Sequence, residues 1–177
     1  MQADNRSSMI LQTTREDHLI AWLTALAITI HLAESALPSP LPGVKPGLAN
    51  IITIAVLVRF GWRVAAWVGV LRVLVGSLVL GTFLSPTFFL SFGGAVASIA
   101  ILGLASLVPG RPFGPLGYSV LSALAHMAAQ FGVAYYFFIP HAALLHLLPV
   151  LMTAAVIFGI VSGTIVAAMF RSSEKRC

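Results

Sequence analysis

Long apolar stretches, broken only by short turns, constrain this chain more than any other feature. Several of them approach or pass ~18 apolar residues, the length at which a stretch is predicted to cross a membrane as a helix. Only 8% of the residues are charged, whereas an ordinary soluble domain has about 25%. The sequence therefore predicts an all-α integral membrane bundle without a soluble domain.

We expect six transmembrane helices, separated by loops rich in proline and glycine. The predicted spans are 18–37, 48–60, 63–81, 87–108, 116–139 and 142–170, the last interrupted by Pro149. The predicted organisation is a cytoplasmic segment 1–17, a six-helix transmembrane domain 18–170 and a cytoplasmic tail 171–177. The second span is short, because ~13 residues rising ~1.5 Å each cover only ~20 Å of a ~30 Å hydrocarbon core.

The distribution of basic residues favours six spans over five. With six spans and the N-terminus inside, the outer side carries only Lys45. The inner side then carries Arg6, Arg15, Arg59, Arg63, Arg111, Arg171, Lys175 and Arg176. The positive-inside rule therefore predicts a protein of the cytoplasmic (inner) membrane with both termini in the cytoplasm. The +5 net charge is thus accounted for by basic residues on the cytoplasmic side. We therefore expect the lipid bilayer as a partner and no nucleic acid.

Arg72 stands near the middle of an otherwise apolar stretch, 64–81. A guanidinium at mid-membrane depth costs about 2.5–3.5 kcal/mol on insertion scales, and it cannot lose its proton to avoid that cost. Its side chain must therefore face the protein interior or a polar cavity. This residue predicts a polar site inside the membrane domain.

Few other polar groups are available to build such a site. Glu34 is the only acid between Asp17 and Glu174. On the fifth span a polar stripe follows helical spacing: Ser119, Ser122, His126 and Gln130. We predict that a polar or anionic solute binds to Glu34, Lys45, Asn50, Arg72, His126 and Gln130. The alternative is that Arg72 pairs with Glu34 or caps helix carbonyls and only fixes the packing, with His126 a satisfied interior histidine.

Small residues recur every four positions on two of the predicted helices: Ala21, Ala25 and Thr29 on the first, and Gly159, Gly163 and Ala167 on the sixth. This spacing lets helix backbones approach one another closely. Two readings stay open, packing inside the bundle and a docking face for another membrane subunit. For Ala21, Ala25 and Thr29 we predict the docking face.

The motifs of autonomous catalysis are missing from the sequence. It has no GxxxxGK[ST] nucleotide-binding motif, no paired-carboxylate site and no aspartate-rich motif to hold magnesium and diphosphate. The single cysteine, Cys177, is the last residue. The histidines have no tight metal-ligand spacing. We therefore expect no enzyme activity, no metal site and no cofactor.

Two segments carry a resemblance to a known family. They are LAESALPSPLPGVKPGLANIITI at 32–54 and LRVLVGSLVLGTFLSPTFFLSFGGAVAS at 71–98. They resemble the bacterial family labelled heptaprenyl diphosphate synthase component I, also called the Gx transporter family. The likeness covers about 23–166, and the PxPGxKPGLAN element is fairly specific to it.

That family in turn is similar to the S components of energy-coupling factor transporters, which are six-helix membrane proteins that bind the substrate. The resemblance implies a ligand near the outer face, partly covered by the loop between helices one and two, here 38–47. It also implies that a small-residue face on helix one docks a membrane coupling subunit. Ala21, Ala25 and Thr29 match that face in position, although Thr29 departs from an all-alanine version.

These observations predict an S-component-like membrane protein that binds a small organic solute, such as a vitamin or cofactor precursor, and works with a coupling subunit and ATPases. The alternative is a non-catalytic membrane subunit of an enzyme of isoprenoid or quinone biosynthesis. Co-purifying ATPases favour the first hypothesis, and a soluble prenyltransferase favours the second.

Overall fold

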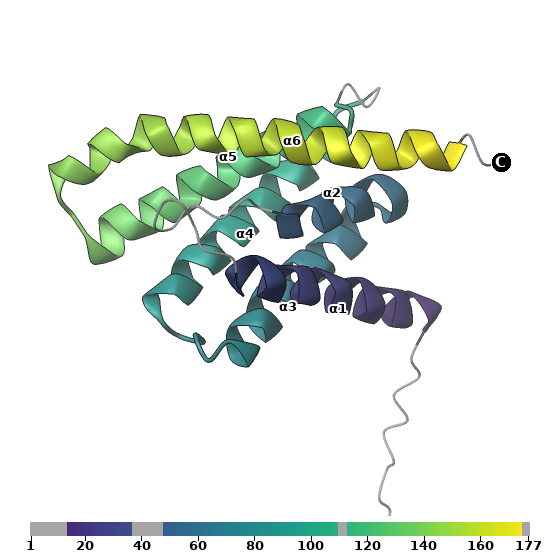
Figure 1. Cartoon of the computed structure of the whole chain (residues 1–177), viewed down its shortest axis with the longest axis horizontal. Helices are drawn as coiled ribbons and strands as arrows, with labels where there is room; N and C mark the ends of the chain where they lie inside the picture. The colour runs from purple at the N-terminus through teal and green to yellow at the C-terminus, as the bar shows by residue number, and fades with distance from the viewer. Residues whose placement is uncertain (1–13, 37–47, 110–112, 175–177) are drawn as a thin grey trace, which may run out of the picture.

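A computed structural model describes residues 14–36, 48–109 and 113–174, apart from the side chains of 34–36, 48–49 and 172–174. Within these ranges the chain forms an all-α bundle without strands, as expected (Figure 1). Its α-helices are α1 (Arg15–Ala36), α2 (Leu48–Phe60), α3 (Trp62–Val79), α4 (Pro86–Ser106), α5 (Pro115–Val133) and α6 (Leu148–Glu174). A π-helical segment, η1 (Ala134–Phe138), and a 3-10 helix, η2 (Ala142–Leu147), lie between α5 and α6.

Helix α1 begins three residues earlier than the sequence predicted, and a capping box explains the difference. The Asp17 backbone N–H donates to Thr14 Oγ1 at 3.2 Å, and the Thr14 backbone N–H donates to Asp17 Oδ2 at 2.8 Å. These bonds satisfy backbone donors that a helix start otherwise leaves open. The bond from the Thr14 backbone lowers the pKa of Asp17 below its ordinary value. The carboxylate therefore stays charged beside the positive end of the helix dipole.

Prolines and caps also mark the other helix starts. Ser85 caps α4 by accepting a hydrogen bond from the Phe88 backbone N–H at 3.3 Å, and Pro86 is the first helical residue. Pro115 opens α5 in the same way. Pro149 was predicted to interrupt the last span. It lies one residue inside α6, directly after η2, where proline is tolerated because its missing N–H has no intrahelical partner.

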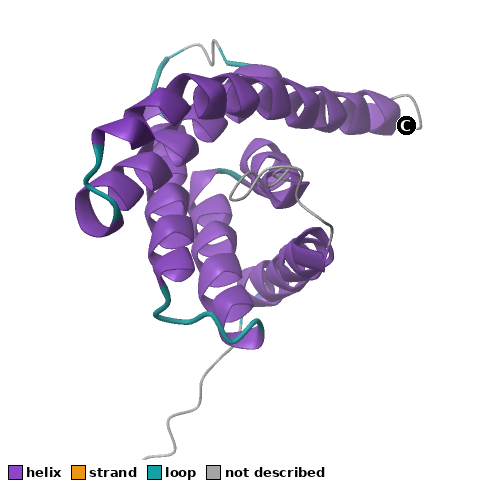
Figure 2. Ribbon diagram, turned by 60° about the vertical axis from the view of Figure 1, so that its left-hand side comes forward, coloured by secondary structure: helices purple, strands orange, loops and turns teal. Residues whose placement is uncertain are grey.

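Helix α5 packs mainly against α4 and α6 and also contacts α2, and α3 packs against α1, α2 and α4. Helix α1 packs against α2 and α3 and lies on the side of the bundle opposite α6 (Figure 1). Short turns join α2 to α3 and α3 to α4 (Figure 2). The α2–α3 turn consists of Gly61 alone, whose φ of 88° lies in the left-handed region that glycine adopts without strain.

Within the described ranges, four helical segments are long and apolar enough to cross a membrane: Trp62–Val79, Pro86–Ser106, Pro115–Phe138 and Ala142–Arg171. The apolar part of α2, Asn50–Phe60, is shorter. Many large apolar side chains on the bundle surface are exposed, among them Trp22 at 77% and Phe137 at 78%. A surface of this kind suits lipid and not water. The chain is thus a membrane bundle, while the six-span count and the orientation remain predictions.

Two apolar clusters fill the interior at different heights. The larger joins the N-terminal half of α3 to the C-terminal half of α4 through Val64, Val68 and Leu102, together with residues of the other helices. The smaller contains Val73, Phe88 and Ala95, from the other half of the α3–α4 pair. Arg72 and Ser98 fall between the two clusters along these helices. The bundle therefore has a polar layer between two apolar ones.

The glycines of α6 pack inside the bundle. A Cβ at Gly159 would lie 3.0 Å from the Val120 Cα, and one at Gly163 would lie 2.7 Å from the Leu116 Cα. Both glycines are buried. The backbones of α5 and α6 thus approach closely because α6 has no side chains at these positions. On this helix the small-residue pattern serves packing.

We predict that Gly163→Leu destabilises the bundle, because the new side chain would collide with the backbone of α5 at Leu116. Overpacking of this kind costs about 1–3 kcal/mol or more. The melting temperature of the purified protein in detergent should fall clearly. Ala168→Leu, on the exposed face of the same helix, is the matched control and should leave it nearly unchanged. Equal melting temperatures for the two variants would contradict the packing described.

Candidate functional site

Arg72 lies in the middle of α3 and is buried, with 9% of its surface exposed. Its charge is close enough to the His126 ring of α5 to act on it. The neighbouring turns of α3 present glycine on the same face, at Gly69 and Gly76. At these two positions α3 packs against Ile99 and Thr53 and against His31, respectively. The guanidinium therefore occupies the interior of the bundle among α1, α2, α4 and α5.

His126 and Gln130 are one turn apart on α5, and both side chains pack against α4. A Cβ built at Gly94 would lie 2.7 Å from His126 Cε1, 2.8 Å from His126 Nε2 and 2.9 Å from Gln130 Cγ. The two side chains thus rest directly on the α4 backbone, in a notch that exists because residue 94 has no side chain. Arg72, His126 and Gln130 belong to one region of the interior.

Asn50 joins this region through a chain of hydrogen bonds. Ser122 Oγ donates to Asn50 Oδ1 at 3.4 Å, and Ser98 Oγ donates to the Ser122 carbonyl at 3.0 Å. These hydrogen bonds link α2, α4 and α5 at Ser122, one turn from His126. We call Asn50, Arg72, Ser98, Ser122, His126 and Gln130 the polar layer.

Further hydroxyl groups are buried near this layer. Thr24, Thr53 and Ser119 are each no more than 6% exposed. Their hydroxyl oxygens have no hydrogen-bond partner in the part of the chain that the structure describes. Buried polar groups normally have a partner. The interior therefore has more hydrogen-bonding capacity than its own described side chains use.

The structure brings together four of the six residues predicted to bind a ligand: Asn50, Arg72, His126 and Gln130. The other two, Lys45 and the side chain of Glu34, lie outside what the structure describes. The loop predicted to cover the ligand, 38–47, also lies outside it. Their contribution, and the ligand-binding role of the four, remain predictions.

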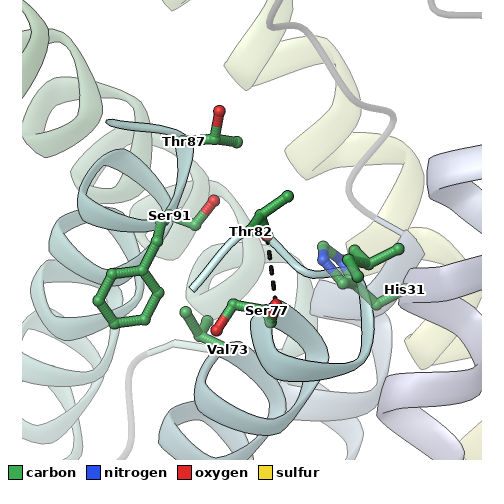
Figure 3. A pocket seen from close by; sticks show the side chains of 8 residues that line it. His31, Val73, Ser77, Thr82, Thr87 and Ser91 are labelled. Atoms are coloured by element: carbon green, nitrogen blue, oxygen red, sulfur yellow. Dashed lines mark hydrogen bonds between the residues drawn. The ribbon is translucent and has the colours of Figure 1, made fainter. Parts of the chain in front are cut away.

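A pocket of about 230 Å³ lies between α1, the C-terminal end of α3 and the start of α4 (Figure 3). Its lining residues are His31, Val73, Ser77, Leu80, Thr82, Thr87, Phe88 and Ser91. Ser91 lies one turn before Gly94 on α4, and Val73 directly follows Arg72 on α3. The pocket is thus adjacent to the polar layer along both helices. We call it the α1–α3–α4 pocket.

The sequence did not single out the four hydroxyl residues of this pocket, Ser77, Thr82, Thr87 and Ser91. One signal was available, since Thr87 and Ser91 are four apart and share a helix face. Aromatic side chains at the ends of membrane helices commonly act as anchors at the lipid–water interface. The exposed Phe83, Tyr136 and Phe137 suit that role, whereas Phe88 is 7% exposed and forms part of the pocket wall.

The predicted docking residues share an exposed face of α1. Ala21, Ala25 and Thr29 are all exposed, and the Thr29 hydroxyl donates to the Ala25 carbonyl at 2.9 Å. This internal bond folds the Thr29 side chain back onto its own helix, which keeps the face low. Trp22 and Leu26 lie along one side of it and are 77% and 49% exposed. The face is exposed in the described part of the chain, and its role as a docking face remains a prediction.

Comparison with known proteins gives one family. The family model described as heptaprenyl diphosphate synthase component I matches residues 23–169, which are 147 of the 177 residues. The matched range contains the polar layer, the α1–α3–α4 pocket and part of the exposed face of α1. No curated protein and no solved structure gives a significant match.

We predict that Gly94→Ala disturbs the polar layer, because a methyl group there would displace both His126 and Gln130. Fitting an extra methyl into a filled site costs about 1–3 kcal/mol, so the melting temperature should fall. Gly132→Ala on α5 is the matched control, since a Cβ there meets nothing within 4 Å. That change should be neutral or slightly stabilising, because alanine favours a helix over glycine by up to ~1 kcal/mol. The notch would be refuted if both variants melted alike.

Proposed function

We propose that this chain, which belongs to the heptaprenyl diphosphate synthase component I family, is a membrane component that binds a small organic solute for transport. The solute would be a vitamin-like or cofactor-precursor compound. A separate membrane coupling subunit and ATPases would supply the energy, since the sequence has no nucleotide-binding motif of its own.

The polar layer is the observation that carries this proposal. A buried arginine, a histidine, two amides and several hydroxyls meet inside an otherwise apolar bundle. Ionisable residues inside membrane domains are rare and usually mark a substrate or ion path. A bundle that needed only stability would be served as well by apolar residues of similar volume. The adjoining pocket of about 230 Å³ provides space for a solute beside this layer.

In this proposal Arg72 is the main contact for an acidic or strongly polar group of the solute. Asn50, His126 and Gln130 would add hydrogen bonds of both polarities, because an amide donates and accepts and a neutral imidazole does the same. Glu34 and Lys45 are proposed as further contacts from the sequence alone. None of these groups is suited to phosphoryl or prenyl transfer, because the chain has five acidic residues in all and its sequence has no aspartate-rich motif to hold a metal–diphosphate.

The exposed face of α1 supports the second half of the proposal, the coupling subunit. Three small residues in helical register form a strip beside the larger Trp22 and Leu26. In a membrane, helix association depends on close backbone approach, which small residues permit. We propose that another membrane helix packs against Ala21, Ala25 and Thr29.

The family description favours a second function, a non-catalytic membrane subunit of a polyprenyl diphosphate synthase. The proposed absence of catalysis by the chain itself agrees with that role. In this case the exposed surface would recruit a soluble synthase, and the polar layer would serve the packing. The two functions differ in what co-purifies and in whether the polar layer holds a compound.

We predict that Arg72→Met abolishes retention of a small compound. The gently purified wild-type protein should retain a compound that mass spectrometry detects after extraction. The variant should retain at least about tenfold less of it, because a hydrogen bond to a charged group contributes about 1.5–3 kcal/mol. Methionine fills much of the arginine volume, and apolar replacement of a buried charge is often tolerated. Arg63→Met, at the exposed start of α3, is the control. If the Arg72→Met variant retained as much of the compound as the wild type, Arg72 would have a packing role only.

We predict that Ala25→Leu removes the partner subunits while the protein stays folded, because the added side chain would fill the strip without touching the rest of the bundle. The measurement is co-purification from native membranes at a moderate expression level. Ala128→Leu, on an exposed position of α5, is the control and should keep the partners. ATPases and a membrane subunit captured by the wild type would support transport. A soluble prenyltransferase captured in their place would support the second function.

A further inference from the structure

The size of the α1–α3–α4 pocket limits what it holds. Its volume is about 230 Å³. Pockets for drug-sized ligands are ~300–1,000 Å³. The space therefore suits one small ring compound.

The hydroxyl groups of the pocket differ in what they offer a ligand. Ser77 Oγ donates to the Leu74 carbonyl at 2.8 Å, and Thr82 Oγ1 donates to the Ser77 carbonyl at 3.5 Å. Their hydrogens are thus directed to the backbone, and their lone pairs remain as acceptors. Thr87 and Ser91 make no hydrogen bond with the described residues, so each is able to donate and accept. The pocket is rich in hydrogen-bond acceptors, so it favours a ligand that carries O–H or N–H donors.

One wall of the pocket is aromatic and fixed in position. Phe88 is 7% exposed and stacks on Phe92, with ring centroids 5.6 Å apart and planes inclined by 21°. Phe83 contacts the same ring, with centroids 5.0 Å apart. A ring held on two sides offers a flat ligand an apolar surface with little entropic cost, and aromatic pairs are worth about 0.5–1.5 kcal/mol beyond area burial.

The described lining residues carry little charge. None of these eight is acidic, lysine or arginine, and the only ionisable one among them is His31. Arg72 precedes Val73 on α3 but is not among these lining residues. A carboxylate in this pocket would lose its hydration without gaining a lysine or arginine partner from these eight residues, which is unfavourable. The described part of the lining therefore favours an uncharged molecule.

From the size, the acceptors, the aromatic wall and the lack of charge, we infer that the α1–α3–α4 pocket binds an uncharged ring compound that carries hydroxyl or amide groups. Thr87 and Ser91 exchange hydrogen bonds with it, Ser77 and Thr82 accept from it, and the Phe88 ring packs against it. This inference rests on the proposed function, because it names the class of solute. It extends the site from the polar layer to a compartment that recognises an uncharged ring.

Matched neutral and anionic probes test this inference on the full chain in lipid nanodiscs. The neutral probes are benzamide and 2-hydroxybenzyl alcohol, and their carboxylate counterparts are benzoate and 2-hydroxybenzoate. Ligand-observed NMR titration gives each Kd, with empty nanodiscs as the blank for partition into lipid. The neutral probes should bind, and each should bind at least about tenfold more tightly than its carboxylate counterpart.

The double variant Thr87→Val/Ser91→Ala removes the two pocket hydroxyls that make no hydrogen bond with the described residues. Neutral-probe binding should weaken on the order of tenfold, since each neutral hydrogen bond contributes a few-fold in affinity. The matched control is Thr153→Val/Thr164→Val on α6, whose exposed hydroxyls bond to the carbonyls of Val150 and Val161. It should bind the probes like the wild type.

The inference is overturned if no neutral probe binds, if the carboxylates bind as tightly, or if the double variant binds like its control. These results separate from the fate of the proposed function. Suppose that the wild type retains a compound which Arg72→Met loses, while the probes bind the pocket variant and its control equally. Solute binding by the protein would then stand, and the ring of the solute would bind outside the α1–α3–α4 pocket. Failure of both measurements would reject the pocket and the solute-binding function together.

Discussion

The desolvation of one guanidinium organises the interior of this protein. Arg72 cannot neutralise itself by losing a proton, so the fold must give it polar surroundings at the depth where lipid offers none. The structure meets this demand with a layer of side chains from four helices, α2 to α5, between two apolar clusters. Each member of the layer is itself costly to bury alone. The layer therefore has to be assembled as a whole, and the helix register of the bundle depends on it.

Glycine positions make that assembly possible. Gly94 lets His126 and Gln130 rest on the α4 backbone, and Gly159 and Gly163 bring α6 close to the backbone of α5. At another level Trp62 covers Gly103 and donates its indole N–H to the Ile99 carbonyl at 2.9 Å. Membrane helices gain little from the hydrophobic effect among themselves, so close approach and interhelical hydrogen bonds provide the specificity. The same short residues that tighten the bundle also leave room for its polar groups.

Two compartments follow one another along α3 and α4. The polar layer holds the positive charge, and the α1–α3–α4 pocket adds hydroxyls and an aromatic wall one turn away. A solute with an uncharged ring and one strongly polar group would match both. Small-molecule sites generally combine an apolar body with a few well-placed polar groups. This division offers a physical basis for selectivity, since the polar layer would bind the strongly polar group and the pocket would favour an uncharged ring.

The helices and the polar stripe of α5 were predictable from the sequence, because their signals act over short distances. Apolar run length and flanking prolines predicted six helical spans, whose ends lie within a few residues of the observed ones when η1 is counted with α5 and η2 with α6. The Thr14–Asp17 capping box accounts for the three-residue difference at the start of α1. The interior position of Arg72 followed from solvation cost alone. The α1–α3–α4 pocket could not be predicted, because His31 and Ser91 are sixty positions apart and meet only through the way α1 packs on α3.

The two small-residue patterns were equivalent in sequence, and only the packing of the helices separated them. Gly159 and Gly163 are buried against α5, whereas Ala21, Ala25 and Thr29 face outward. Spacing along one helix fixes which residues share a face, but which face is covered depends on the neighbouring helices.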